Sequence, residues 1–152
     1  MSDEANAGEG LEVAPANTER MADFAVMSVG SVIVDLPDTF ATLSLQEHEP
    51  PFRAFQLPVG LADGAAIAAI TEERPSPRPS TQDLFATALM RTGVDVIAAR
   101  ITGMVNGNYL AEVDLLTQSG RVVLECRPSD AINLALRHPG RAPILVDATL
   151  CD

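Results

Sequence analysis

The stretch Arg127–Leu136 constrains the fold most, because it joins the end of a strand directly to the start of a helix. A β-rich run, Arg121–Cys126, leads into it, and Pro128, which has no backbone N–H, stops that strand. Ser129 is a favourable N-cap residue, and Asp130 adds negative charge at the positive end of the helix dipole. The residues that follow are nearly all apolar. The stretch therefore predicts a buried helix with an arginine and a carboxylate at its N-terminus.

The same order of residues occurs earlier, at Arg78–Leu84, where Arg-Pro-Ser again precedes an acid and an apolar helix. Ser80 and Asp83 have the spacing of a capping box, with Asp in place of the usual Glu. A well-capped helix explains either stretch alone. Because there are two, we expect that the two helix N-termini can face one another.

These stretches resemble the bifunctional nuclease (BFN) domain family of bacteria and plants, over roughly residues 24–150. The matching segments are Gly60–Ala68, Arg78–Leu84, Asn106-Gly107 and Glu125–Ala131. The chain departs from the family pattern at Gln82, where the family has His. Asp63-Gly64 also replaces Glu-Ala, and Glu125-Cys126 replaces Asp-Ala. The resemblance implies a nuclease acting on DNA and RNA phosphodiesters, and the missing His is the departure that matters most for chemistry.

Composition indicates one domain preceded by a tail. The 152 residues are 47% hydrophobic but only 4% aromatic, so the core must be aliphatic. Residues 1–20 show no apolar periodicity and are expected to be a disordered acidic leader, followed by a single domain over residues 21–152. No apolar run approaches the ~20 residues of a membrane span, and the start of the chain lacks a signal-peptide pattern. We expect a cytoplasmic protein.

The net charge of −11 argues against ordinary nucleic-acid binding, which depends on Lys and Arg neutralising phosphates. Lysine is absent, so all ten basic residues are arginine. Only a bound divalent cation or a local arginine cluster could bring in a phosphate. Cys126 and Cys151 make neither a disulfide framework nor a metal-ligand spacing.

The hydrophobic pattern predicts runs of strands followed by helices, which is typical of the α+β class. Asn106-Gly107 favours a two-residue hairpin turn. Helices are expected over residues 63–72, 81–91 and 129–137, and the second should turn Leu84, Phe85, Ala88 and Leu89 to the core. The two halves each read as three strands and a helix, and the BFN resemblance implies a mixed, barrel-like sheet with this internal repeat. Strands are expected over residues 24–36, 40–45, 52–59, 94–102, 108–116, 121–126 and 142–146.

Nuclease chemistry commonly uses Mg²⁺ or Mn²⁺ held by carboxylates. Of the acids in the chain, Asp83 and Asp130 are the preferred metal ligands, because helix capping would hold them rigidly. Arg78 and Arg127 could clamp a phosphate in bidentate fashion. Glu125 and Gln82 complete the candidate catalytic set. The other available carboxylates are Asp63, Glu112 and Asp114.

A structural interpretation of the same residues stays open. Arg127 with Asp83, or Arg78 with Asp130, would make ion pairs between the two halves without catalysis. Glu112 and Asp114 read as members of a solvated strand face, and His48 and His138 read as surface residues. The chain would then be a non-enzymatic binding or regulatory module; a binder of small ligands at the helix N-termini has less support. We also expect a homodimer or larger homo-oligomer, because the first and third helices carry little polar surface.

Overall fold

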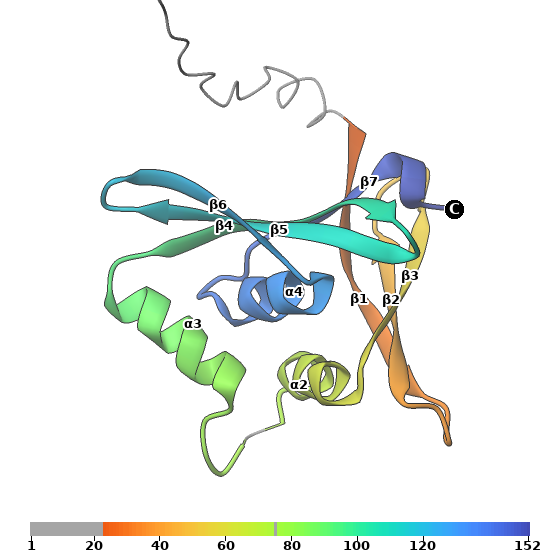
Figure 1. Ribbon diagram of the computed structural model, residues 1–152, viewed down its shortest axis with the longest axis horizontal. Helices are drawn as coiled ribbons and strands as arrows, with labels where there is room; N and C mark the ends of the chain where they lie inside the picture. The colour runs from red at the N-terminus through yellow and green to blue at the C-terminus, as the bar shows by residue number, and fades with distance from the viewer. Residues whose placement is uncertain (1–22, 75) are drawn as a thin grey trace, which may run out of the picture.

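The computed structural model describes residues 23–74 and 76–152 (Figure 1). The expected leader at residues 1–20 lies outside the described residues, as does the proposed start of the domain at Met21. None of the described helices is long and apolar enough to cross a membrane.

A seven-stranded mixed sheet organises the fold, in the order β3-β2-β1-β7-β4-β5-β6. Of the six neighbouring pairs of strands, five are antiparallel, and the sixth, β4 with β7, is parallel. The strands are β1 Phe24–Val34, β2 Phe40–Glu47, β3 Ala54–Gly60, β4 Asp95–Val105, β5 Asn108–Thr117, β6 Gly120–Cys126 and β7 Ile144–Asp147.

The predicted repeat is visible in the element order. The first half runs β1-β2-β3 into helix α2 (Leu61–Thr71), and the second runs β4-β5-β6 into helix α4 (Pro128–Arg137). Strand β7 joins the halves, because it pairs with β1 on one side and with β4 on the other. Among the described strands, β3 and β6 each have one neighbour, so the sheet is bent but open, and the expected barrel-like closure is not confirmed.

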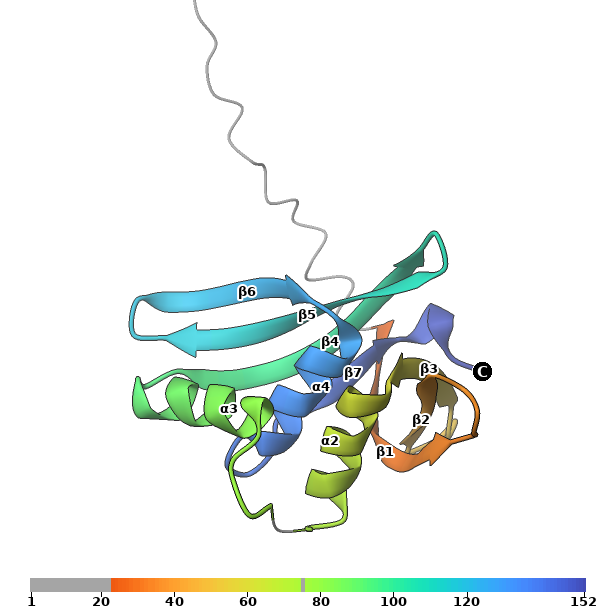
Figure 2. The same ribbon diagram turned by 60° about the horizontal axis from the view of Figure 1, so that its bottom comes forward.

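Helix α4 forms the centre of the core, as its apolar sequence predicts. It lies against β4 and β5, between α2 and helix α3 (Thr81–Arg91) (Figures 1 and 2). Its residues from Ser129 to Leu136 are buried, apart from Asp130. The chain itself therefore covers α4, so the lack of polar surface on this helix does not call for an oligomer.

Helix α2 approaches the first half closely because of Gly64. A Cβ atom at Gly64 would lie 2.8 Å from the Cβ atom of Ala41 on β2, so a larger residue would push the helix away. The neighbouring Ile67 is fully buried at this contact. Glycine at the position where the family pattern has alanine thus lets α2 pack directly on the sheet.

Helix α3 differs from its prediction, because none of its residues is buried. Leu84 is 65% exposed and Phe85 is 48% exposed, and Ala88 is also exposed. Only Ala86 and Leu89 pack against the core. The expected core stripe is confirmed at Leu89 and wrong at Leu84, Phe85 and Ala88, because α3 touches α4 at the rim of the molecule instead of lying under the sheet.

The predicted hairpin turn is confirmed. Asn106 and Gly107 have φ values of 52° and 79°, as a two-residue hairpin turn of this kind requires. The ladder between β1 and β2 shifts register between Val29 and Ser31, which indicates a bulge at Gly30.

Candidate functional site

The N-terminus of α4 is built around Asp130. The helix begins one residue earlier than predicted, so that Arg127 is the N-cap residue and Pro128 occupies the first helical position. Asp130 Oδ2 accepts a hydrogen bond from the Arg127 backbone N–H at 3.3 Å. Ser129, predicted as the N-cap residue, is instead buried inside the first turn, where its carbonyl accepts from the side chain of Asn133.

The Arg127 side chain links the starts of two helices. Its guanidinium donates to Asp130 at 3.0 and 2.9 Å, and to Asp63 in the first turn of α2 at 3.1 and 3.5 Å. The Arg127 side chain remains 65% exposed while that of Asp63 is 14% exposed. The guanidinium therefore crosses between the two halves and still presents an open surface.

The start of α3 has the predicted capping box. Ser80 Oγ accepts from the Asp83 backbone N–H at 3.1 Å, and Asp83 Oδ2 accepts from the Ser80 N–H at 2.9 Å. The other oxygen of Asp83 pairs with Arg137 Nε at 2.8 Å. Hydrogen bonds from the Ser80 backbone and from Arg137 hold the pKa of Asp83 below its ordinary value. At neutral pH Asp83 is therefore an ionised structural carboxylate.

Arg137 is the residue that the sequence analysis missed. Its side chain is 6% exposed and also donates to Asn133 Oδ1 at 2.6 Å and to the Ala66 carbonyl at 3.2 Å. Its position in the last turn of α4 indicates only a favourable interaction with the helix dipole. The contact with Asp83 could not be read from the sequence, because the two residues lie far apart in it.

The expected ion pairs of Arg127 with Asp83 and of Arg78 with Asp130 were therefore wrong. Asp83 reaches α4 at its last turn, through Arg137, whereas Asp130 belongs to the first turn of that helix. The two preferred metal ligands do not share a partner. Arg78 is exposed, and no ion pair joins it to another of the described residues.

The candidate catalytic residues Asp83 and Asp130 line two different cavities. A cavity of about 420 Å³ lies between α3, α4, β5 and β6, and has a mainly apolar lining that includes Phe85 and Leu134. Four of the six candidate catalytic residues line it, namely Gln82, Glu125, Arg127 and Asp130. Asp83 instead lines a second hollow of about 740 Å³, together with Arg74, Arg137, His138 and Arg141.

Cys126 also lines the first cavity, but it is not prepared for nucleophilic chemistry. Burial, with a smaller contribution from the charge of Asp130, raises the pKa of its thiol to about 11. A thiol with this pKa is protonated at neutral pH and is a poor nucleophile. Cys126 thus packs as a small apolar residue, in agreement with its position against the core.

Although Glu125 is one of the residues that line the first cavity, strand alternation directs its side chain to the opposite face of the sheet from Leu124 and Cys126. It pairs across the ladder with Glu112, and side chains of neighbouring strand residues alternate between faces. Glu125 and Glu112 therefore share the sheet face that the helices do not cover. The strand ends at Cys126, so its alternation does not extend to Arg127.

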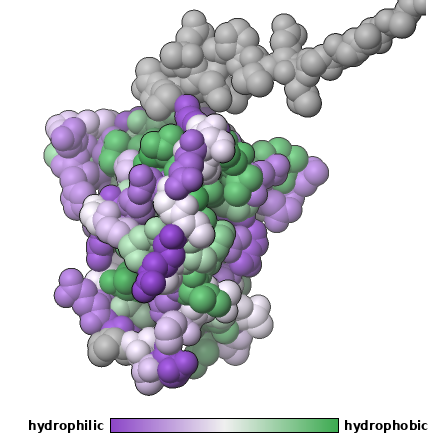
Figure 3. All heavy atoms as spheres, turned by 90° about the vertical axis from the view of Figure 1, so that its left-hand side faces the viewer, coloured by the Kyte–Doolittle hydropathy of each residue, from purple (hydrophilic) through white to green (hydrophobic). Residues whose placement is uncertain are grey.

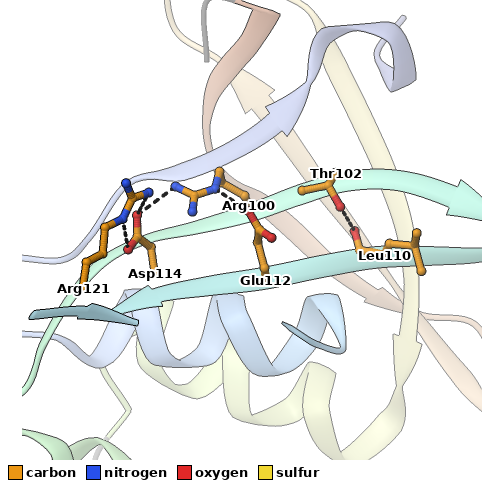
Figure 4. A network of polar contacts seen from close by, with 6 residues as sticks. All are labelled: Arg100, Thr102, Leu110, Glu112, Asp114 and Arg121. Atoms are coloured by element: carbon orange, nitrogen blue, oxygen red, sulfur yellow. Dashed lines mark hydrogen bonds and ion pairs between the residues drawn. The ribbon is translucent and has the colours of Figure 1, made fainter. Parts of the chain in front are cut away.

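That uncovered face carries an ion network of four residues (Figure 4). Asp114 accepts from Arg121 at 2.7 and 2.6 Å and from Arg100 at 3.1 Å, and Arg100 also donates to Glu112 at 2.9 Å. Asp114 is 1% exposed and Arg100 is 5% exposed. The solvated interpretation of Asp114 was therefore wrong, because side chains from β4 and β6 cover it.

The two histidines lie outside both helix N-termini, as expected. His48 is exposed and contacts Ser28, and His138 lies 3.9 Å from Asp95 at the end of α4. Neither histidine lines the cavity that contains Gln82. No imidazole therefore takes the place of the histidine that the family pattern has at position 82.

Comparison with known proteins gives a family match. A model of the bifunctional nuclease domain matches residues 43–152, which include α2, α3, α4 and both helix-capping clusters. No curated protein matches the chain. The matched segment covers most of the sequence, and the chain therefore belongs to the bifunctional nuclease domain family.

Proposed function

We propose that the protein is a nuclease that cleaves phosphodiester bonds of DNA and RNA in the cavity between α3, α4 and β6. The observation that carries this proposal is Arg127, which combines a firmly held guanidinium with a side chain that is 65% exposed. Membership of the bifunctional nuclease domain family supplies the reaction class. In the reaction, a water oxygen forms a bond to phosphorus, the ester P–O bond breaks, and the water proton passes to the leaving oxygen.

The residues at the cavity have different roles in the proposed reaction. Arg127 lies at the positive end of the α4 dipole, so a phosphate there would meet both a guanidinium and a helix N-terminus. Asp63 and Asp130 hold the guanidinium in place from two directions. Gln82 lines the cavity from α3 and has an amide that can orient a water, although it cannot take up its proton.

A divalent cation does not fit these residues as they lie. Both oxygens of Asp130 accept from Arg127, and those of Asp83 accept from Ser80 and Arg137. Within residues 23–74 and 76–152, no three His, Cys, Asp or Glu side chains are grouped as ligands for a metal ion. We assign no step to Mg²⁺ or Mn²⁺, and the dependence on them implied by the family resemblance is left to experiment.

A non-enzymatic binding module is the second candidate function. The ion pairs of the carboxylates favour a binding module, because each candidate acid of the helix N-termini is already neutralised by an arginine. The net charge of −11 also predicts weak, strongly salt-dependent association with a polynucleotide. In both cases we place the protein in the cytoplasm.

Restoring the family histidine separates the two candidates. We expect Gln82→His to raise cleavage of fluorescent single-stranded DNA and RNA by about 10²–10⁴-fold, because an imidazole can act as a general base near neutral pH. Each assay is run with Mg²⁺, with Mn²⁺ and with EDTA. The matched control is Thr87→His, which adds an imidazole to α3 at the other hollow.

Loss of the gain in Gln82→His Arg127→Ala would support phosphate binding by Arg127. Suppose instead that wild type, Gln82→His and Thr87→His all cleave at the same background rate under every metal condition. The nuclease proposal would then fail for this chain, and the binding-module proposal would stand.

A further inference from the structure

The larger hollow of the molecule plays no part in the proposed reaction. It has a volume of about 740 Å³ and lies between α2, α3 and the C-terminal end of α4 (Figure 2). Pockets that bind small organic molecules generally measure about 300–1,000 Å³. Gln82, Arg127 and Asp130 line the other cavity and not this one. The hollow is therefore a second space of ligand size, separate from the cavity that contains Arg127.

Arginine is concentrated at this hollow. The chain has 21 acidic and 10 basic residues, yet three arginines line the hollow, namely Arg74, Arg137 and Arg141. Among the described residues, two acids line it with them, Glu73 and Asp83, and Asp83 is paired with Arg137. The lining thus carries a surplus of positive charge in a protein that is otherwise strongly acidic. This charge favours an anionic ligand.

Arg137 is the rigidly held cation of the hollow. Its contacts with Asp83, Asn133 and the Ala66 carbonyl occupy Nε–H and one N–H on each Nη atom. The second N–H on each Nη atom has no partner among the described residues. A guanidinium fixed from three helices is a preorganised donor for the oxygens of an anion.

Arg141 combines an exposed side chain with an unusual backbone conformation. Its φ is 57°, in the left-handed region that glycine adopts without steric cost. Its backbone N–H donates to the His138 carbonyl at 2.7 Å and closes the turn after α4. No ion pair joins Arg141 to another described residue. Glycine would serve this turn equally well, so the guanidinium is available to a ligand.

A second residue with positive φ lies at the same hollow. Glu73 has a φ of 52° at the end of α2, where the backbone N–H of Arg74 donates to the Ala69 carbonyl at 2.9 Å. Residues held in such conformations cluster at ligand-binding sites. Arg74 pairs with Glu72 at 2.9 Å, but both side chains are 60% exposed. An exposed pair of this kind is weak, so Arg74 can exchange Glu72 for a ligand.

Helix α3 turns its polar side toward the hollow. Ser80, Asp83 and Thr87 line it and recur at helical spacing. Leu84 and Phe85 are exposed instead, and hydrophobic residues stand among hydrophilic ones on the side of the molecule that carries α3 (Figure 3). An ordinary amphipathic helix has the opposite arrangement, with its apolar side inward. An inward polar stripe suits a space that receives a polar ligand.

The remaining wall of the hollow is apolar. Ala69 and Ile70 contribute to it from α2, and Leu136 contributes from α4. Such a wall has no hydrogen bonds to offer an inorganic anion, but it can pack against the flat ring of an organic one. The lining therefore matches a ligand that has a charged end and an apolar end.

We propose that this hollow binds a small organic phosphate monoester of the size of a nucleoside monophosphate. The phosphate meets the exposed guanidinium groups of Arg74 and Arg141, together with the free N–H groups of Arg137, since arginine binds phosphate in bidentate fashion. The nucleoside packs against Ile70 and Leu136. Binding at this site does not depend on the proposed nuclease activity.

Isothermal titration calorimetry of the full chain in EDTA tests the proposal. The four ligands are AMP, GMP, CMP and UMP, each raised to about 1 mM, the range of a weak ligand. We expect saturable binding of at least one nucleotide. Its nucleoside and inorganic phosphate should each bind at least about tenfold more weakly, because each lacks one part of the contacts.

The variant Arg141→Gly separates binding from folding. It should weaken nucleotide binding about tenfold or more, because it removes a charged donor. It should not lower the midpoint of thermal unfolding, because glycine suits a φ of 57°. Arg74→Gln should weaken binding in the same way. The matched control is Arg91→Gln, which removes the same charge from an exposed arginine outside the hollow and should leave binding unchanged.

Absence of saturable binding for all four nucleotides overturns the proposal. Equal affinity for the nucleotide and its nucleoside, or for the nucleotide and inorganic phosphate, also counts against it. So does an affinity that Arg91→Gln lowers as much as Arg141→Gly does, because only the net charge would then matter. Arg127→Ala should bind the nucleotide as wild type does. A loss of binding in Arg127→Ala without a loss in Arg141→Gly would place the ligand in the other cavity and overturn the proposal.

Discussion

The two halves of the sheet have the same order of elements but end in different ways. The outer strand of the first half, β3, carries Pro58 at its edge, and its Ala54 exchanges backbone hydrogen bonds with Asp152 at the end of the chain. The outer strand of the second half, β6, has no proline and pairs with β5 alone among the described strands. One edge is therefore blocked and the other is open to a partner.

The halves also differ in how charge is buried. Within residues 23–74 and 76–152, Arg100 and Asp114 are the charged residues that are buried as a whole, and the Arg137 side chain is only 6% exposed; all three belong to the second half. The first half instead packs aliphatic residues such as Leu43 and Leu57. The two halves thus share the same order of strands and helices, but their side chains differ. The first half has an apolar interior, and the second half has an ion-paired face next to an open edge of the sheet.

The largest expected effect comes from removing Asp114. Asp114→Ala leaves Arg100 buried with only Glu112 for a partner, and should lower the free energy of unfolding by about 3–5 kcal/mol. Urea denaturation followed by circular dichroism measures the change. Glu125→Ala on the same face is the control and should cost little, because Glu125 is exposed. If Asp114→Ala lowers the free energy of unfolding no more than the control does, the ion network does not stabilise the second half.

Low pH should lower the stability of the second half, because it protonates the carboxylate of Asp114. Burial alone would raise the pKa of Asp114, but hydrogen bonds and charges from Arg121 and Arg100 outweigh burial and hold the pKa below its ordinary value. The resulting stabilisation is fully present above the unfolded pKa of about 3.9 and is lost as the pH falls through the folded value. Denaturation between neutral and acidic pH should show a steeper loss in wild type than in Asp114→Asn. Equal slopes would contradict this.

A smaller effect is expected at the junction of the halves. Asp130→Ala should cost about 0.5–2 kcal/mol, because it removes the acceptor for the Arg127 N–H, while the exposed Arg127 is not left in an apolar site. Asp63→Ala should cost about 1 kcal/mol or less, since it breaks only an ion pair with a solvated partner. Chemical denaturation of both variants and of the double variant checks the order. A larger loss of unfolding free energy for Asp63→Ala than for Asp130→Ala would show that the contact between the halves contributes more to stability than the helix cap.

The smallest effect should come from opening the blocked edge. Pro58→Val restores an N–H at an exposed position of β3 and should change stability by about 0.5 kcal/mol or less, as for other surface substitutions. It should also increase association, measured by light scattering against wild type, because one edge protection is lost. An unchanged association would show that Asp152 protects β3 without the proline.

The sequence by itself determined the local structure. Strand runs, the Asn106-Gly107 turn and the Ser80–Asp83 capping box depend on residues within a few positions of one another, so their patterns are sufficient to predict them. The buried character of α4 follows equally from its apolar run, which only Asn133 interrupts. The family motifs also marked Gln82, Arg127 and Asp130, which the fold places on one cavity.

Tertiary structure alone decided which distant partner a charge meets. Arg127 pairs with Asp63 and Arg137 with Asp83, over separations of 64 and 54 residues that no local pattern encodes. The exposure of α3 and the burial of Asp114 depend in the same way on where whole elements lie in the sheet. The physical reason is that capping and turn preferences act between neighbours, whereas burial and ion pairing depend on distances that exist only after the two halves have come together.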